Sequence, residues 1–572
     1  MFETSSAPNK PGQVSERRAV AAAAFVFSLG TLASRILGLI RDRMTAQYFP
    51  VEVRDAFIVA FRLPNMFRRL LGEGALSVSM IPVLVDLLTK KASTQKAIED
   101  GNSEEAQAAA RAHYEAAKRL VGSIFTLLLG ITITLSTLAI LFMDDILGFL
   151  VSGEGYMSVA GKFDLTVKLA RIMFGFLILI TLYAFFMAIL NSLRKFALAA
   201  LAPTMFNISM IAAALVSRDF AAPEDVLAWS VIVGGFLQMA ILIPSIVKAG
   251  YWPKISLIWK VDGKWVPFWK VEEVRRVFKA LAPSLFGLSI LQLSTLISVY
   301  FASRLPQGSH FYLYCADRIL ELPLSLFAVS VGSAVLPTLS AQWSRGDREA
   351  MTSTLSHSLR LIAFVALPSA IGMFMLAQPI TEVIFLGKEF KYQDVVPTAE
   401  VIQVYAIGLV VTAMGRILVQ GFYAMGNTWY PAMVGAITLV VHFLFAWAGT
   451  TTFGLKGLAA ASIVSGLVNL TMLAVAYSRW IGPLGWPAMF GRLARFAVAG
   501  LALAAGCLIY EPFISEFGSR FFSRTFALGF SILLGGSLYM AASAAMGLEE
   551  YKETTARLIG KVANKFSRKK HV

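Results

Sequence analysis

The stretch that decides the fold reads SRILGLIRDRMTAQYFPVEVRDAFIVAFRLPNMFRRLLGEGALSVSMIP and runs from Ser34 to Pro82. It occupies the first two long apolar segments of the chain. The arginines inside or close to these apolar runs are Arg35, Arg41, Arg62, Arg68 and Arg69. A cation at the centre of a membrane-spanning helix costs about 2.5–3.5 kcal/mol on insertion scales. Such charges in adjacent apolar segments therefore indicate contact with water, with acidic side chains or with an anionic ligand.

The composition excludes a soluble protein of this size. The chain has 572 residues, of which 57% are hydrophobic and 15% charged, and its mean hydropathy is +0.67. Soluble domains carry about 25% charged residues. The net charge of +16 is typical of a membrane protein that collects Lys and Arg in its cytoplasmic loops, and we do not expect nucleic acid as a partner.

Apolar runs separated by short polar breaks predict an all-α polytopic membrane protein with about fourteen transmembrane helices. The expected spans are 19–41, 55–88, 118–142, 165–191, 197–217, 226–248, 280–303, 311–341, 357–384, 396–424, 430–450, 455–478, 493–510 and 525–546. The second and eighth runs each contain a Pro and a Gly near the middle, namely Pro64 with Gly72 and Pro323 with Gly332. This pattern predicts broken helices that line a cavity.

Lys and Arg concentrate in alternate polar segments, beginning with the N-terminal tail. The positive-inside rule then places both termini in the cytoplasm, with an even number of spans. The strongest basic loop, 248–279, divides the chain into six spans and eight. The runs around Pro64 and Pro323 occupy corresponding positions in the two parts, which predicts two pseudo-symmetric lobes.

The predicted domains follow from these features. They are a cytoplasmic tail (1–18), an N-lobe (19–248), a basic cytoplasmic linker (249–279), a C-lobe (280–478), two extra spans (479–546) and a basic cytoplasmic tail (547–572).

Three motifs resemble a known family. SRILGLIRD followed by DAFIVAFRLPNMFRRLLGEGALS, then YCADRILELPLSLFAVSVGSAVLPTLS (314–340) and GFYAMGNTWYP (421–431), are similar to landmarks of the MurJ/MviN lipid II flippases. That family belongs to the multidrug/oligosaccharidyl-lipid/polysaccharide exporter superfamily. The landmarks come in family order.

The resemblance implies a cationic central cavity in which arginines hold the diphosphate of a lipid-linked muropeptide. Guanidinium suits this task because it stays charged and binds phosphate oxygens bidentately. The substrate-binding residues implied are Arg35, Arg41, Asp55, Arg68 and Arg318. Supporting or pairing residues are Arg62, Arg69, Glu73, Asp317, Glu321 and Arg416.

The structural alternative is that these arginines pair within the protein. Arg69 and Glu73 are four residues apart and Arg318 and Glu321 three apart, so each pair can meet on one helix face. Arg35 and Arg41 lie about 120° apart on an ideal helix and face one cavity only if it is wide or the helix bends. For Arg416 the choice between ligand and neighbouring helix stays open.

The resemblance further implies alternating access, with lipid II leaving the cytoplasmic leaflet, and a groove for the lipid tail in the extra spans. We expect a multi-pass protein of the bacterial inner membrane. Its expected partners are lipid II and membrane lipids, and whether it also binds other cell-wall synthesis proteins stays open. The alternatives are another lipid-oligosaccharide flippase or drug exporter of the superfamily, a membrane enzyme on polyprenyl phosphates, and a non-transporting cell-wall scaffold.

No enzyme, cofactor or metal signature is found in the sequence. The motifs GxSxG, HExxH and GxxxxGK[ST] are missing, and the two cysteines, Cys315 and Cys507, form no C-x-x-C. Some family members bind sodium through an aspartate of the seventh span, which here has no acid. His442, in the eleventh span, is expected to be a packed, hydrogen-bonded group.

Overall fold

The computed structural model describes residues 11–70, 76–99, 104–261, 264–518 and 520–556. The chain divides into two compact units. Unit 1 comprises residues up to 49, 56–149 and 160–289, and unit 2 comprises 50–55, 150–159 and 290 onward. Within the described residues the fold is helical, apart from one two-stranded antiparallel hairpin. The expected all-α membrane architecture is confirmed.

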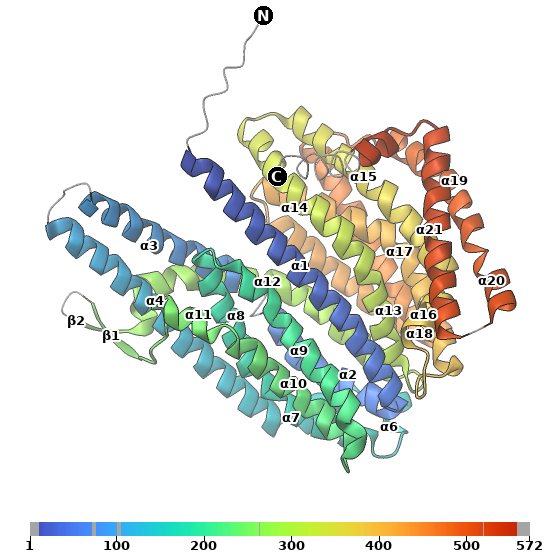
Figure 1. The fold of residues 1–572 in the computed structure, drawn as a ribbon, viewed down its shortest axis with the longest axis horizontal. Coiled ribbons are helices and arrows are strands. Elements are labelled where there is room, and N and C mark those ends of the chain that lie inside the picture. Colours follow the sequence, from blue (N-terminus) through green and yellow to red (C-terminus); the bar gives the residue numbers. More distant parts are fainter. Residues whose placement is uncertain (1–10, 71–75, 100–103, 262–263, 519, 557–572) are drawn as a thin grey trace, which may run out of the picture. The chain divides into compact units, whose positions relative to one another are not determined.

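Unit 1 is built on long helices that follow the apolar runs. It contains α1 (Pro11–Tyr48), most of α2 (Val51–Phe67), α3 (Leu76–Glu99), α4 (Glu104–Leu141), α5 (Met143–Leu150), α7 (Lys162–Phe174), α8 (Phe176–Ser192), α9 (Phe196–Val216), α10 (Pro223–Ala240), α11 (Ile243–Lys248), the hairpin β1 (Ile258–Val261) and β2 (Lys264–Pro267), and the first part of α12 (Glu272–Ala302). Short 3-10 turns follow α9 (Ser217–Asp219) and β2 (Phe268–Lys270). Helices α1, α9 and α10 lie side by side, with α9 in the middle (Figure 1).

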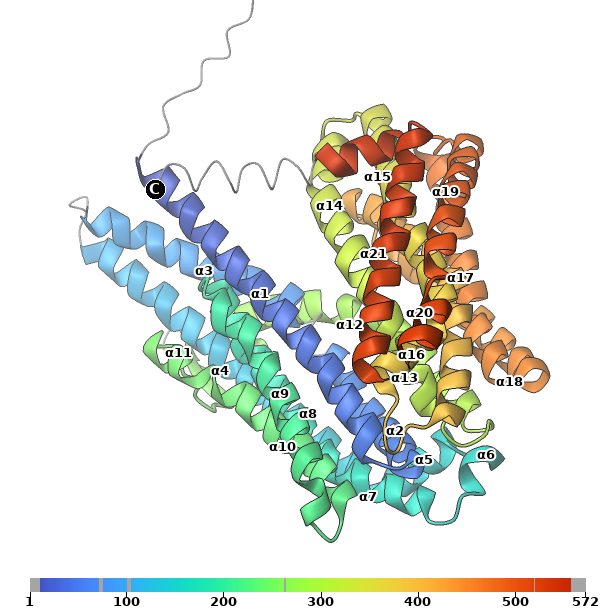
Figure 2. The same cartoon turned by 45° about the vertical axis from the view of Figure 1, so that its right-hand side comes forward.

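Unit 2 surrounds a central helix, α17 (Tyr392–Ala424). The other elements are α6 (Glu154–Met157), the end of α12, α13 (Ser309–Pro323), a π-helical segment (Leu324–Ala328), α14 (Val329–Ser344), α15 (Arg348–Met375), α16 (Ala377–Phe385), α18 (Trp429–Trp480), α19 (Trp486–Cys507), α20 (Tyr510–Phe517) and α21 (Phe521–Ala545). Helix α17 packs against α13, α14, α15, α16 and α18 (Figure 2). Helices α19 and α21 pack on each other at the C-terminal end of the unit.

Ten helices within the described residues are long and apolar enough to cross a membrane. One of them, α18, has 52 residues, about 78 Å at 1.5 Å per residue, far more than a bilayer core of about 30 Å. Its backbone breaks at Gly454, where φ is 59° and ψ is −131°. This helix therefore covers the two expected spans 430–450 and 455–478. The count of fourteen spans and the domain limits stay predictions.

The two runs expected to be broken do lose α geometry just after the proline. In α2 the backbone turns π-helical at residues 68–70, four residues after Pro64. In unit 2, Pro323 ends α13 and the π-helical segment Leu324–Ala328 follows directly. Proline removes a backbone donor and clashes with the carbonyl four residues earlier, so each proline disturbs the helix around it. Residues 309–344 still form one continuous helical run, and the expected breaks stay predictions. The equivalence of the two helices across lobes stays a prediction.

Candidate functional site: the arginines of α1, α2 and α13

The two predicted arginines of α1 differ in their surroundings. Arg35 is exposed, whereas Arg41 is 6% exposed. The guanidinium of Arg41 donates to Oδ1 of Asp42 from Nη2 (2.6 Å) and Nε (3.0 Å), and from Nη1 to Oδ1 of Asn207 on α9 (3.1 Å). Asn207 in turn donates to the carbonyl of Ser34 (2.9 Å). Arg41 thus joins α1 to α9, which is what the structural alternative expects of it.

The arginines of α2 lie around the proline break. Arg62, Arg68 and Arg69 are all half-buried. The Nε atom of Arg68 donates to Oδ1 of Asn65, one turn earlier (2.9 Å). Because Arg68 lies in the π-helical turn, its backbone direction differs from that of a regular helix. The predicted partner of Arg69, Glu73, lies outside the described residues.

Asp55 is completely buried and binds backbone amides at the start of α13. Its Oδ2 accepts from the N–H of Gly308 (2.7 Å) and its Oδ1 from the N–H of Phe311 (3.0 Å). The first amides of a helix have no partner within the helix, and a carboxylate there also meets the positive end of the helix dipole. Asp55 therefore caps the helix that holds Arg318. Its predicted contact with substrate stays untested.

Sequence reasoning missed the neighbour of Asp55. Arg54 is 0% exposed, and its Nη2 pairs with Oδ2 of Asp394 on α17 at 3.3 Å. The guanidinium also lies over the rings of Phe311 (4.9 Å) and Phe390 (5.1 Å). Asp394 further accepts from the Tyr312 hydroxyl (2.5 Å). Arg54 lies more than 250 residues before the other members of this cluster, so no local spacing in the sequence could reveal it.

Arg318 on α13 has features of both predicted roles, ligand binding and pairing within the protein. Its side chain is 34% exposed, and Nη1 lies 3.7 Å from Oε2 of Glu321, as the spacing predicted. Nε donates to the Tyr314 hydroxyl (3.2 Å), and the guanidinium lies 5.3 Å from the centre of that ring. Asp317 beside it is half-buried. An ion pair this open to solvent contributes little to stability, about 0–1 kcal/mol.

Helix α17 adds Arg416, which is exposed and within electrostatic reach of Glu321. Unit 2 therefore brings together Arg318, Glu321 and Arg416 on α13 and α17. Unit 1 holds Arg35 on α1 and the arginine group on α2. Planar cations of this kind suit a phosphate ligand. Among the described residues, no group of three His, Cys, Asp or Glu is placed to hold a metal ion.

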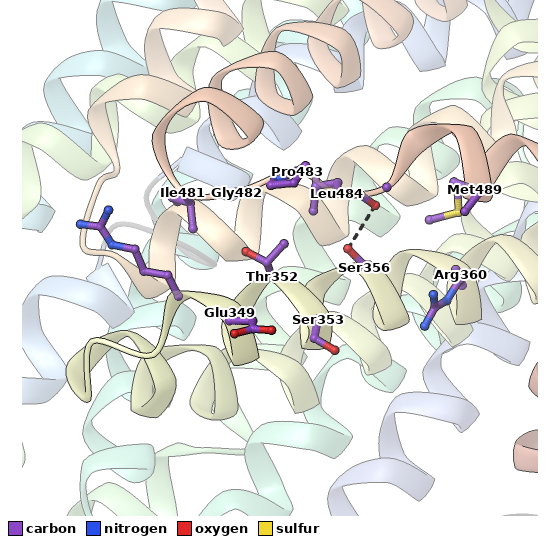
Figure 3. A pocket seen from close by; sticks show the side chains of 13 residues that line it. Glu349, Thr352, Ser353, Ser356, Arg360, Ile481, Gly482, Pro483, Leu484 and Met489 are labelled. Atoms are coloured by element: carbon purple, nitrogen blue, oxygen red, sulfur yellow. Dashed lines mark hydrogen bonds between the residues drawn. The ribbon is translucent and has the colours of Figure 1, made fainter.

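A separate cavity of about 550 Å³ lies in unit 2 between the start of α15 and the loop 481–485 (Figure 3). Thr352, Ser353 and Ser356 face it from α15, and the Ser356 hydroxyl donates to the carbonyl of Leu484 (3.2 Å). None of the predicted substrate-binding residues lines this cavity.

The helices and their arginines define the class: a multi-pass, all-α membrane protein with cationic side chains inside its apolar runs. The family model described as "Lipid II flippase MurJ" matches residues 46–535. The chain therefore belongs to this family of transporters.

Individual relatives agree. A "Probable lipid II flippase MurJ" of Bdellovibrio bacteriovorus is 36% identical over 94% of this chain and 97% of its own length. A "Lipid II flippase MurJ" of Burkholderia cenocepacia is 31% identical over 84% of this chain and 88% of its own. The resemblance found in the motifs is thus confirmed over most of the chain.

Two solved structures share the fold. "Lipid II flippase MurJ, inward closed conformation" matches with a TM-score of 0.70 at 23% identity, over 91% of this chain and 98% of the other. An inward-facing multidrug resistance transporter of the MATE family matches with a TM-score of 0.59 at 13% identity, over 82% of this chain and 98% of the other. Both are less than 25% identical to this chain, so the two matches show a shared fold.

Proposed function

We propose that this protein moves lipid II from the cytoplasmic to the outer leaflet of the bacterial inner membrane by alternating access. The observation that carries the proposal is the family match over residues 46–535, reinforced by relatives that bear the name over nearly their whole length. The drug exporters of the superfamily match in fold at 13% identity, which carries no argument about substrate.

The proposed diphosphate contacts are Arg35, Arg68 and Arg318. The side chain of each is at least partly exposed, whereas the guanidinium of Arg41 is buried and donates hydrogen bonds to Asp42 and Asn207. A planar guanidinium can bind two phosphate oxygens at once. Asp55 acts on this site indirectly in the proposal, because it fixes the start of α13 and thereby the helix that holds Arg318.

The proposed orientation has both termini in the cytoplasm and the last two spans providing a groove for the lipid tail. An inside-negative potential then favours outward movement of an anionic headgroup by about 2.3 kcal/mol per charge per 100 mV. The sequence holds no phosphate-binding ATPase motif, so the proposal draws its driving force from a gradient or the potential.

Depletion of the protein in its host tests the proposal. We expect lipid II to accumulate in the inner leaflet while the amount accessible to an external enzyme falls. Re-expression of the unchanged protein restores the distribution, and so does the control variant Arg348→Ala, whose arginine is exposed at the start of α15. An unchanged outer pool after complete depletion contradicts the proposal.

A further inference from the structure

The linker between α11 and α12 folds into a hairpin with two different faces. Strands β1 (Ile258–Val261) and β2 (Lys264–Pro267) pair antiparallel, with Ile258 opposite Pro267 and Trp259 opposite Val266. Side chains alternate between the faces of a strand. Trp259 and Val266 therefore share one face, and Ile258, Pro267 and Trp265 share the other.

The first face is fastened to α4 within unit 1. Trp259 packs so closely on Gly122 that a Cβ atom at this glycine would lie 2.7 Å from the indole ring. The Ser256 N–H donates to Oγ1 of Thr126 (3.0 Å), one turn further along α4. The hairpin is therefore held in a defined orientation by a spanning helix.

The second face is open and apolar. Trp265 is 72% exposed and Ile258 52% exposed. Three residues that flank the hairpin in the chain are also exposed, namely Ile255 (67%), Leu257 (61%) and Trp269 (55%). We call these five residues the aromatic face. Large apolar side chains gathered on one surface usually mark contact with a partner or a membrane.

Lysines accompany the aromatic face. Lys254 and Lys270, which flank the hairpin in the chain, are exposed. Lys264 is exposed too, but the register places it on the face of Trp259 and Val266. From residue 248 to residue 271 the sequence contains five lysines and one acid, Asp262. A surface that combines tryptophan with lysine is complementary to anionic headgroups above an apolar layer.

The attachment to α4 sets the depth of the hairpin. Gly122 and Thr126 lie four to eight residues inside the third expected span, which begins at 118, or about 6–12 Å along the helix. Trp252 stacks on Phe186 of α8, with ring centres 6.0 Å apart, near the corresponding end of the fourth expected span. Both contacts lie within about 12 Å of the corresponding ends of two expected spans, so the hairpin lies close to that boundary of the expected membrane region.

We propose that the aromatic face, with Lys254 and Lys270, binds anionic phospholipid headgroups of the cytoplasmic leaflet. The inference concerns lipid binding and not transport. It depends on the proposed function in one respect, the proposed orientation that puts this linker on the cytoplasmic side. Indole rings favour the membrane–water interface because they combine an apolar body with one N–H donor. The lysines add an attraction that depends on anionic lipid and weakens with salt.

The test uses the full chain in lipid nanodiscs with and without phosphatidylglycerol. Cys315 and Cys507 are replaced by alanine, and Trp265→Cys is labelled with an environment-sensitive fluorophore. Gln107→Cys is the matched control, because Gln107 is exposed on the same helix α4, about 16 Å before the expected span. Nitroxide-bearing lipids report contact with the headgroup region, and the folded state of each variant is checked by gel filtration.

We expect the label at 265 to shift to the blue and to be quenched by nitroxide lipid, while the label at 107 stays in water. Quenching at 265 should fall severalfold without phosphatidylglycerol, in high salt, or with Lys254→Glu and Lys270→Glu together. A label at 265 that is as hydrated as the one at 107 overturns the proposal. In that case the aromatic face does not contact lipid and is left for another protein. Quenching that ignores phosphatidylglycerol and the charge reversal also overturns it. No substrate is present, so either failure leaves the proposed transport function untouched.

Discussion

The buried ion pair Arg54–Asp394 shows the structural role of one charged residue in the stretch from Ser34 to Pro82. Arg54 has no exposed surface, Asp394 is 2% exposed, and two aromatic rings cover the guanidinium. Removing one partner of a buried pair leaves an uncompensated charge, at a cost of about 3–5 kcal/mol. We expect Arg54→Ala to lower stability by about this amount, measured as thermal unfolding of the purified protein.

The matched control for that change is an exposed ion pair. Lys168 lies 2.7 Å from Asp225, but its side chain is 49% exposed. Exposed pairs contribute about 0–1 kcal/mol, so Lys168→Ala should change stability little. Equal losses for the two variants would show that burial does not decide the role of these charges.

Arg318 separates the ligand role from the pairing role. If it binds a diphosphate, Arg318→Lys keeps the charge but loses the planar fork, and complementation of a depleted strain should weaken. Arg318→Ala should abolish growth at a normal amount of membrane protein. Because Glu321 is 47% exposed, its carboxylate stays hydrated when Arg318 is removed, and we expect no loss of folded protein.

The double variant decides between the two roles. Arg318→Ala with Glu321→Ala removes both members of the pair, so a merely structural role predicts that growth returns. A ligand role predicts that growth stays lost while the protein is still present at normal level. Growth of the double variant would therefore refute the assignment of Arg318 to substrate.

At the scale of elements, the sequence predicted local changes of helix geometry better than the contacts. Pro64 and Pro323 are local signals, because proline changes the helix in which it stands, and a π-helical turn follows each of them. The cap of α13 by Asp55 and the link from Arg41 to Asn207 depend on residues that meet only after folding. Hydrophobic periodicity records the burial of a helix but not the identity of its neighbour, so these contacts could not be predicted.

The sharp turn inside α18 gives a prediction at this scale. Its two halves touch backbone to backbone, since a Cβ atom at Gly457 would lie 1.9 Å from the carbonyl oxygen of Gly449. An added methyl group must separate the halves, and overpacking of this kind costs about 1–3 kcal/mol. Gly457→Ala should therefore lower thermal stability. The control Gly536→Ala, with nothing near its Cβ position in α21, should leave stability unchanged or raise it by up to about 1 kcal/mol.

At the scale of the whole molecule, the distribution of charge along the chain can be read directly from the sequence. The acids Asp144 and Asp225 of the expected outer segments pair with Arg171 and Lys168. At the expected inner end of unit 2, Arg492 pairs with Glu549 (3.0 Å) and Glu550 (2.6 Å) of the segment after α21. The side with an excess of positive charge stays in the cytoplasm when the chain inserts into the membrane. The contacts within the folded protein do not show which side that is, so the orientation needs a separate test.

Fusions to alkaline phosphatase, which is active only outside the cytoplasm, provide that test. A fusion after Val572 should be silent, because the basic tail 547–572 follows an even number of expected spans. The positive control is an insertion at Gly161, which is exposed, has a φ of 72° and lies in the expected outer segment between α6 and α7. Exposed loop positions of this kind tolerate insertions. Strong activity of the C-terminal fusion would place the C-terminus outside and refute the predicted topology, whereas a silent fusion together with an active insertion is the result that fourteen spans with both termini inside require.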